Sequence, residues 1–174
     1  MDTQSTTTML PKTILVGLDG SAGSVRALDW AINLAKSLGA EIVAVHVAQM
    51  LPPAAVSFGI APIELPLASL DDLRRRFETE WAAPLKAAGV RYRTVFETDA
   101  PPAPTLIGLA REVHADLVVT GSRGLGGFGE LLLGSVSHQL VLHAQVPVVV
   151  IPPEHKKVTV SPQTLSSPEM VAAP

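Results

Sequence analysis

The chain has 174 residues, of which 47% are hydrophobic, 17% are charged and 4% are aromatic, and its formal net charge is −3. This length favours one domain, and the slight negative charge argues against a nucleic-acid-binding surface. The absence of cysteine excludes a disulfide framework and a thiol nucleophile. No apolar run approaches the roughly 18 residues that span a bilayer, and residues 1–8 lack a secretion signal, so we expect a soluble cytoplasmic protein without a membrane partner.

The first half of the chain alternates β-rich runs with an amphipathic segment. Thr13–Leu18 predicts a first strand, and the helical spacing of alanines and leucines predicts a helix over Gly23–Leu38, ended by Gly39. Glu41–Ala48 is an almost continuous apolar run, which is typical of a strand buried on both faces. Residues 49–66 contain four prolines and one glycine without a clear period, so we expect a long connection there.

A second helix is predicted after this connection. Ser69 and Asp72 resemble a capping box at its start, and apolar residues then follow at helical spacing. Because Pro84 lacks a backbone donor, we expect the helix to kink or restart near Ala83 before it ends at Gly89. The dense basic run Arg74, Arg75 and Arg76 is flanked by acidic residues on the same helix, which favours a solvated face.

The remaining elements complete a repeating strand and helix pattern. Val90–Glu97 predicts a third strand, three prolines mark its exit, and a third helix ends near His114. Asp116–Gly121 predicts a fourth strand, Gly134–Ala144 a fourth helix and Val146–Ile151 a fifth strand. This alternation predicts an α/β fold with a parallel sheet, right-handed crossovers and helices on both faces.

The segment between the fourth strand and the fourth helix carries the strongest functional signal. Residues 121–137 read GSRGLGGFGELLLGSVS. Glycines permit positive φ and close approach of a ligand, and the first N–H groups of the following helix favour an anion, with hydroxyls from Ser135 and Ser137. Ligands of such sheets bind beyond the carboxyl ends of the strands. If the first and fourth strands are neighbours, Asp19 and the glycine-rich segment therefore share one crevice.

The glycine spacing is specific: two residues separate Gly121 from Gly124, nine separate Gly124 from Gly134, and Ser135 follows. With ILVGLDGS, AVHV and VPVVVIP at the predicted strands, the chain resembles a single-domain universal stress protein of the ATP-binding type. The resemblance implies a Rossmann-like, adenine nucleotide-binding fold with the sheet order 3-2-1-4-5. It also implies a nucleotide-binding domain over residues 12–153. The composition of the chain predicts flexible tails at 1–11 and 154–174, and the tail beyond Glu154 and the 49–66 connection depart from the family pattern.

The resemblance also implies roles for individual residues. The Asp19 carboxylate would accept from the ribose hydroxyls, the backbone around Val47 would hold the adenine edge, and the glycine-rich segment would hold the phosphates, with Mg²⁺ carried by them. Arg123 stands where the family commonly has a basic or histidine side chain. The implied nucleotide-binding residues are Gly17, Leu18, Asp19, Val47, Gly121, Ser122, Arg123, Gly124, Gly134, Ser135, Val136 and Ser137, and no metal ligand is among them.

Several of these residues have a second interpretation. Asp19 also fits the cap of the first helix, and the glycine-rich segment also fits a surface connection. His46 lies in an apolar strand, which favours a core histidine bonded to a neighbouring carbonyl over a ligand-binding one. His138 and His143 are five residues apart, a spacing that favours surface residues over a metal pair.

The function predicted from the resemblance is an ATP-binding, nucleotide-dependent regulator of the stress response. The alternatives are slow ATP hydrolysis with autophosphorylation, binding of AMP or cyclic AMP, and a pure interaction module. Gly124, Gly126 and Gly129 fit GxGxxG but lie far from the helix start, and no P-loop lysine occurs. The apolar run at Val146–Ile151 is a candidate edge strand, so we expect a homodimer through it.

Overall fold

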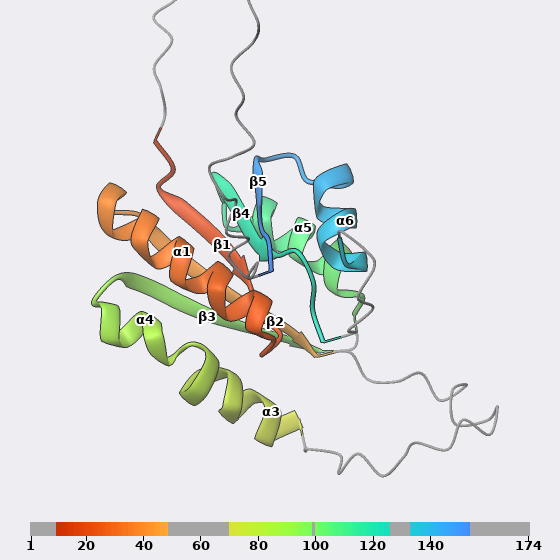
Figure 1. The fold of residues 1–174 in the computed structure, drawn as a ribbon, viewed down its shortest axis with the longest axis horizontal. Coiled ribbons are helices and arrows are strands. Elements are labelled where there is room, and N and C mark those ends of the chain that lie inside the picture. The colour runs from red at the N-terminus through yellow and green to blue at the C-terminus, as the bar shows by residue number, and fades with distance from the viewer. Residues whose placement is uncertain (1–9, 49–69, 99, 126–132, 154–174) are drawn as a thin grey trace, which may run out of the picture.

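The computed structural model describes residues 10–48, 70–98, 100–125 and 133–153. Its sheet has five parallel strands in the order β3-β2-β1-β4-β5, which confirms the predicted order (Figure 1). The strands are β1 (Thr13–Gly17), β2 (Glu41–Ala48), β3 (Arg91–Thr98), β4 (Leu117–Gly121) and β5 (Val148–Ile151). Outside the described residues lie both predicted tails apart from residues 10 and 11, the predicted connection 49–66, the capping residue Ser69, Gly126 and Gly129.

Helices cover both faces of the sheet, as the alternating pattern predicts (Figure 1). One face carries α1, α3, a π-helical turn η1 and α4, and the other carries α5 and α6. No helix in the described part of the chain is long and apolar enough to cross a membrane. The helical segments are α1 (Ala22–Leu38), α3 (Leu70–Arg76), η1 (Phe77–Trp81), α4 (Ala83–Ala88), α5 (Pro102–Glu112) and α6 (Ser135–His143).

The central strand β1 shows how the sheet separates two cores. Ile14 and Val16 pack with α1 on one face, whereas Leu15 packs with α5 and α6 on the other, and all three side chains are fully buried. Successive side chains of a strand point to opposite faces, so a strand with helices on both sides needs apolar residues at every position. This burial fixes β1 in the middle of the sheet and places its carboxyl end beside that of β4.

Helix α1 begins directly after the turn that follows β1. Its N-cap is Ser21, whose Oγ accepts from the Ser24 N–H at 3.2 Å, so the alternative in which Asp19 caps this helix is wrong. The helix ends at Gly39, which has φ of 66° and donates its N–H to the Ala35 carbonyl. Asp19 is thus free of the capping role that the sequence left open.

The second predicted helix is interrupted where Pro84 disturbs it, and α4 restarts at Ala83 as predicted. The interruption takes a form that was not predicted, a π-helical turn in which the Ala82 N–H donates to the Phe77 carbonyl five residues earlier, at 2.9 Å. Pro84 has no N–H for the Glu80 carbonyl, and its ring would crowd that group in a regular helix. The wider turn relieves this conflict without ending the helical arm.

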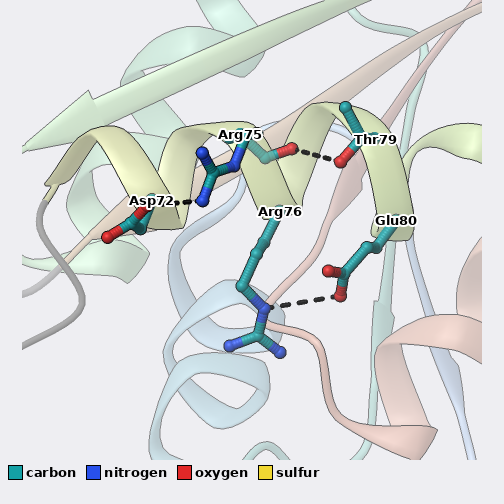
Figure 2. Close-up of polar contacts among 5 residues, drawn as sticks. All are labelled: Asp72, Arg75, Arg76, Thr79 and Glu80. Atoms are coloured by element: carbon teal, nitrogen blue, oxygen red, sulfur yellow. Dashed lines mark hydrogen bonds and ion pairs between the residues drawn. The ribbon is translucent and has the colours of Figure 1, made fainter. Parts of the chain in front are cut away.

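The basic run on α3 lies on a solvated surface, as the flanking acidic residues predict. Figure 2 shows two ion pairs there: Arg75 Nη2 lies 2.6 Å from Asp72 Oδ1, and Arg76 Nε lies 3.4 Å from Glu80 Oε2. The Thr79 hydroxyl donates to the Arg75 carbonyl at 2.7 Å (Figure 2). Because these side chains are exposed, each pair contributes at most about 1 kcal/mol, so this surface does not determine the fold.

Candidate functional site

A pocket of about 710 Å³ opens at the carboxyl edge of the sheet, where the strand order reverses between β1 and β4. Its volume lies in the range of small-molecule sites, and its position is where open α/β sheets bind ligands. All of the predicted nucleotide-binding residues except Ser122 line it. They are Gly17, Leu18, Asp19, Val47, Gly121, Arg123, Gly124, Gly134, Ser135, Val136 and Ser137.

The Asp19 carboxylate and the glycine-rich segment share this crevice. Asp19 Oδ1 accepts from the Ser21 N–H at 3.0 Å, which fixes the orientation of the carboxylate. Asp19 Oδ2 lies so close to Gly124 that a Cβ atom at this position would overlap it. Any side chain at position 124 would therefore displace the carboxylate, and glycine keeps the space beside it open.

Gly121 and Gly124 serve close approach rather than unusual backbone conformation. Among the described glycines, positive φ occurs at Gly20, Gly39 and Gly89, so Gly121, Gly124 and Gly134 do not use the positive φ that glycine permits. A Cβ at Gly121 would lie 2.7 Å from the carbonyl carbon of Gly23. The physical reason for glycine is thus contact between the end of β4 and the start of α1.

The N-terminus of α6 faces the same pocket. Gly134 is its N-cap, with φ of −75° and ψ of 168°, and no side chain in the described part of the chain caps the helix. The first helical hydrogen bond runs from the His138 N–H to the Gly134 carbonyl at 3.0 Å. The N–H groups of Ser135, Val136 and Ser137 precede this bond, so they and the helix dipole favour an anion at this end of the pocket.

The backbone of Ser122 and the hydroxyl of Ser137 make hydrogen bonds within the protein. The Ser122 N–H donates to the Ile151 carbonyl at 2.8 Å, and its own carbonyl accepts from the Gly134 N–H at 2.7 Å. The Ser137 hydroxyl lies 2.9 Å from the Ser122 carbonyl and 3.0 Å from the Gly134 carbonyl. Its single proton is used within the loop, so donation from Ser137 to a ligand stays a prediction that requires this bond to break. Ser135 is exposed and carries the accessible hydroxyl.

Sequence reasoning missed the remaining lining residues of the pocket, most of which are apolar. Thr120 precedes Gly121 at the end of a buried strand, and this position alone could have indicated it. Trp81 could not be found in this way, because its place depends on the unpredicted π-helical turn. The missed lining residues are Ser24, Val45, His46, Ala48, Leu73, Trp81, Pro102, Leu106, Thr120, Leu125 and Leu133.

Comparison with known proteins shows which family this chain belongs to. Residues 11–152 match the family model described as the universal stress protein family. The chain belongs to this family. The universal stress protein YxiE of Bacillus subtilis is 34% identical over 146 residues, which cover 79% of this chain and 97% of that protein.

Solved structures of other universal stress proteins agree with this assignment. One from Burkholderia pseudomallei is 30% identical, with a TM-score of 0.59, and the match covers 82% of this chain and 96% of that one. Another, solved in complex with cAMP, is 28% identical, with a TM-score of 0.58, and the match covers 83% of this chain and 98% of that one. The five-stranded parallel sheet is therefore shared with known universal stress proteins.

His46 is a buried histidine at the edge of the pocket of this universal stress protein. Its Nδ1 lies 2.7 Å from the Leu18 carbonyl, which confirms the predicted core role and assigns the proton to Nδ1. Its Nε2 is buried and has no hydrogen-bond partner among the described residues, and the ring centroids of Trp81 and Phe96 lie 5.0 and 5.5 Å from that of His46. Burial lowers the pKa of His46, opposed by the Leu18 hydrogen bond and the Asp19 charge.

This lowered pKa predicts acid sensitivity of the fold. The unfolded chain takes up the proton near pH 6.5, whereas the folded protein resists it, so the unfolded state binds more protons between the two pKa values. The free energy of unfolding should therefore fall as the pH drops below about 6.5, by up to about 1.4 kcal/mol per pH unit, until the folded pKa is reached. Urea unfolding at pH 7, 6 and 5 measures this dependence.

The matched variant for this prediction is His46→Asn. Its amide nitrogen can still donate to the Leu18 carbonyl, but it cannot titrate in this range. The variant should lose stability less steeply than the parent protein between pH 7 and 5. Equal slopes for the two proteins would show that burial of His46 has no part in the acid sensitivity.

Proposed function

We propose that this protein binds ATP and acts as a nucleotide-dependent regulator of the stress response. The observation that carries the proposal is the convergence of three features on one pocket: the Asp19 carboxylate, the close backbone at Gly124 and the uncapped N-terminus of α6. A carboxylate accepts from ribose hydroxyls, and free N–H groups at a helix start bind phosphate oxygens. The pocket joins both kinds of group within about 710 Å³.

In the proposed complex the nucleotide lies across the carboxyl ends of β2, β1 and β4. The adenine edge contacts the backbone at Val47, the ribose hydroxyls donate to Asp19, and the phosphates lie between Gly121, Gly124 and the start of α6. Among the described residues no three His, Asp or Glu side chains gather as metal ligands. Mg²⁺ would therefore be bound through the phosphate oxygens of the nucleotide, which are ligands that Mg²⁺ prefers.

A second candidate ligand is cyclic AMP, because a universal stress protein 28% identical to this chain was solved in complex with it. The two ligands present different groups to Asp19: ATP has free 2′ and 3′ hydroxyls, whereas the 3′ oxygen of cyclic AMP is esterified. AMP shares the free hydroxyls with ATP. The affinities of the three nucleotides therefore distinguish these candidates, and phosphate release from ATP over hours tests the hydrolysis alternative in the same samples.

The deciding experiment identifies the nucleotide directly. The purified protein is denatured, and the released small molecules are separated by chromatography; the emptied and refolded protein is then titrated calorimetrically with ATP, AMP and cyclic AMP. We expect ATP to be released and to bind with the highest affinity. Release of another nucleotide with higher affinity would transfer the proposal to that ligand, and no binding of any nucleotide would refute it.

We also propose that the regulator is a homodimer formed through the segment 146–151. This proposal rests on β5, which lies at the edge of the sheet and pairs with β4, and on the apolar residues Val141 and Leu142 of α6, which are 51% and 58% exposed. An apolar edge strand readily pairs with a second copy. A monomeric mass at tens of micromolar in sedimentation equilibrium would refute this mode of association.

A further inference from the structure

We propose that Trp81 is a positioning residue. It acts through Gly20 to hold the turn at Asp19 in the conformation that directs the carboxylate toward the ribose hydroxyls. This inference rests on the proposed function, because it assigns to Trp81 a part in presenting the carboxylate that the nucleotide would contact. Trp81 lies more than sixty positions from Asp19 in the chain, and it reaches the turn from η1 on the helical arm.

The contact between Trp81 and the turn is direct. Gly20 has φ of +78°, and a Cβ atom there would lie 2.5 Å from Cζ2 and 2.6 Å from Cε2 of Trp81. The indole ring therefore packs on the Cα atom of Gly20, at a distance that no other residue type allows. Gly20 is intrinsically free to leave this conformation, so a bulky group that covers it restricts the turn.

The turn is also held from its other side. His46 Nδ1 donates to the carbonyl of Leu18, the residue before Asp19, at 2.7 Å. The rings of His46 and Trp81 meet edge to face, with centroids 5.0 Å apart and an angle of 78° between their planes. The two residues that flank Asp19 are thus held by two aromatic side chains that contact each other.

The π-helical turn explains how Trp81 comes to lie there. A π-turn widens the helix by one residue and so changes the direction of every side chain that follows its start. Phe77 anchors the beginning of the turn, because its side chain is fully buried, and Trp81 ends it with its ring centroid 6.3 Å from that of Phe77. In a regular helix the direction of Trp81 would differ, and the indole would leave Gly20 uncovered.

The consequence falls on the carboxylate. Asp19 Oδ1 is bonded to the Ser21 N–H at 3.0 Å, across the very residue that Trp81 covers, and Oδ2 faces Gly124 in the pocket. If Gly20 changes its φ, the Ser21 N–H moves and the carboxylate loses its orientation. Trp81 also lines the pocket, but its contact with Gly20 gives it an effect on ribose recognition through the backbone of the turn.

The test compares tryptophan deletions against two ligands. Trp81→Ala should weaken ATP binding about 10-fold, the effect of losing one preorganised group, and should change binding of 2′,3′-dideoxy-ATP less than about 2-fold. Trp81→Phe should recover most of the affinity because a ring still covers Gly20. The matched control is Trp30→Ala, which removes the other tryptophan, 39% exposed on α1 and outside the pocket lining. It should leave both affinities unchanged.

A ligand-free measurement separates this inference from the proposed function. Exchange of the Ser21 amide hydrogen, followed by NMR, should accelerate about 10-fold in Trp81→Ala relative to Trp30→Ala, because the turn opens more often. Equal losses for ATP and the dideoxy nucleotide, or unchanged exchange at Ser21, would overturn the positioning role while ATP binding itself stood. Failure of the parent protein to bind ATP, with the exchange still accelerated, would refute the nucleotide function and leave the hold on the turn intact.

Discussion

Gly134→Glu is expected to weaken ATP binding by at least about 100-fold while the protein remains folded. Gly134 has φ of −75° and ψ of 168°, a conformation open to any residue, and its Cβ would meet its nearest neighbours at an ordinary 3.5 Å. The new carboxylate would occupy the anion position at the start of α6. Juxtaposed like charges cost several kcal/mol, and every 1.4 kcal/mol is a tenfold loss of affinity.

Two controls separate the effect of the added negative charge from the effect of the added side-chain volume. Gly134→Ala adds the Cβ alone and should bind ATP within about 3-fold of the parent protein, since the site leaves room for it. Adenosine carries no phosphate, so its affinity should be the same for Gly134→Glu and Gly134→Ala. Calorimetric titration gives these five affinities, three for ATP and two for adenosine, and thermal unfolding verifies the fold. Retained ATP affinity in a folded Gly134→Glu variant would place the phosphates elsewhere.

The central strands could be predicted because a strand that is buried on both faces has apolar residues at almost every position. An almost continuous apolar run such as Glu41–Ala48 coincides with β2 to the residue. At the sheet edge the agreement is looser: the fifth strand was predicted from Val146, but β5 begins at Val148. Pro147 lies between them and has no N–H, so it takes part only through its carbonyl, which accepts from the Val118 N–H at 3.0 Å.

The pocket residues whose place follows from strand order and side-chain chemistry could be predicted from the sequence. Those whose place depends on packing between helices and the sheet could not. Asp19 and Gly124 follow neighbouring parallel strands, so topology alone brings them together. The position of Trp81 depends on the π-helical turn that relieves the conflict at Pro84. An apolar pattern with the α-helical period of 3.6 residues does not reveal such a turn. Ser122 was included through the family resemblance, but in the structure its backbone joins β5 and α6 and its side chain does not line the pocket.

Asp19→Asn is expected to weaken ATP binding about 10-fold to 100-fold. Hydrogen bonds to a charged group contribute about 1.5–3 kcal/mol, and the amide that replaces the carboxylate lacks the charge and one acceptor. Only the amide oxygen can accept from the Ser21 N–H, so the amide nitrogen must take the place of Oδ2 beside Gly124. The turn is thereby preserved, and the substitution changes chiefly the atom that would face the ribose.

The control for Asp19→Asn is the same substitution at Asp116, which lies at the other end of the sheet. Asp116 Oδ2 accepts from the N–H groups of Lys12 and Thr13 at 2.8 and 2.9 Å, beside the amino ends of β1 and β4. Asp116→Asn should leave ATP affinity unchanged even where it lowers stability. The loss in Asp19→Asn should be largest for ATP, smaller for cyclic AMP with its single free hydroxyl, and absent for 2′,3′-dideoxy-ATP. ATP and the dideoxy nucleotide share the phosphate and adenine contacts. An equal loss of affinity for both would therefore show that Asp19 does not contact the ribose hydroxyls.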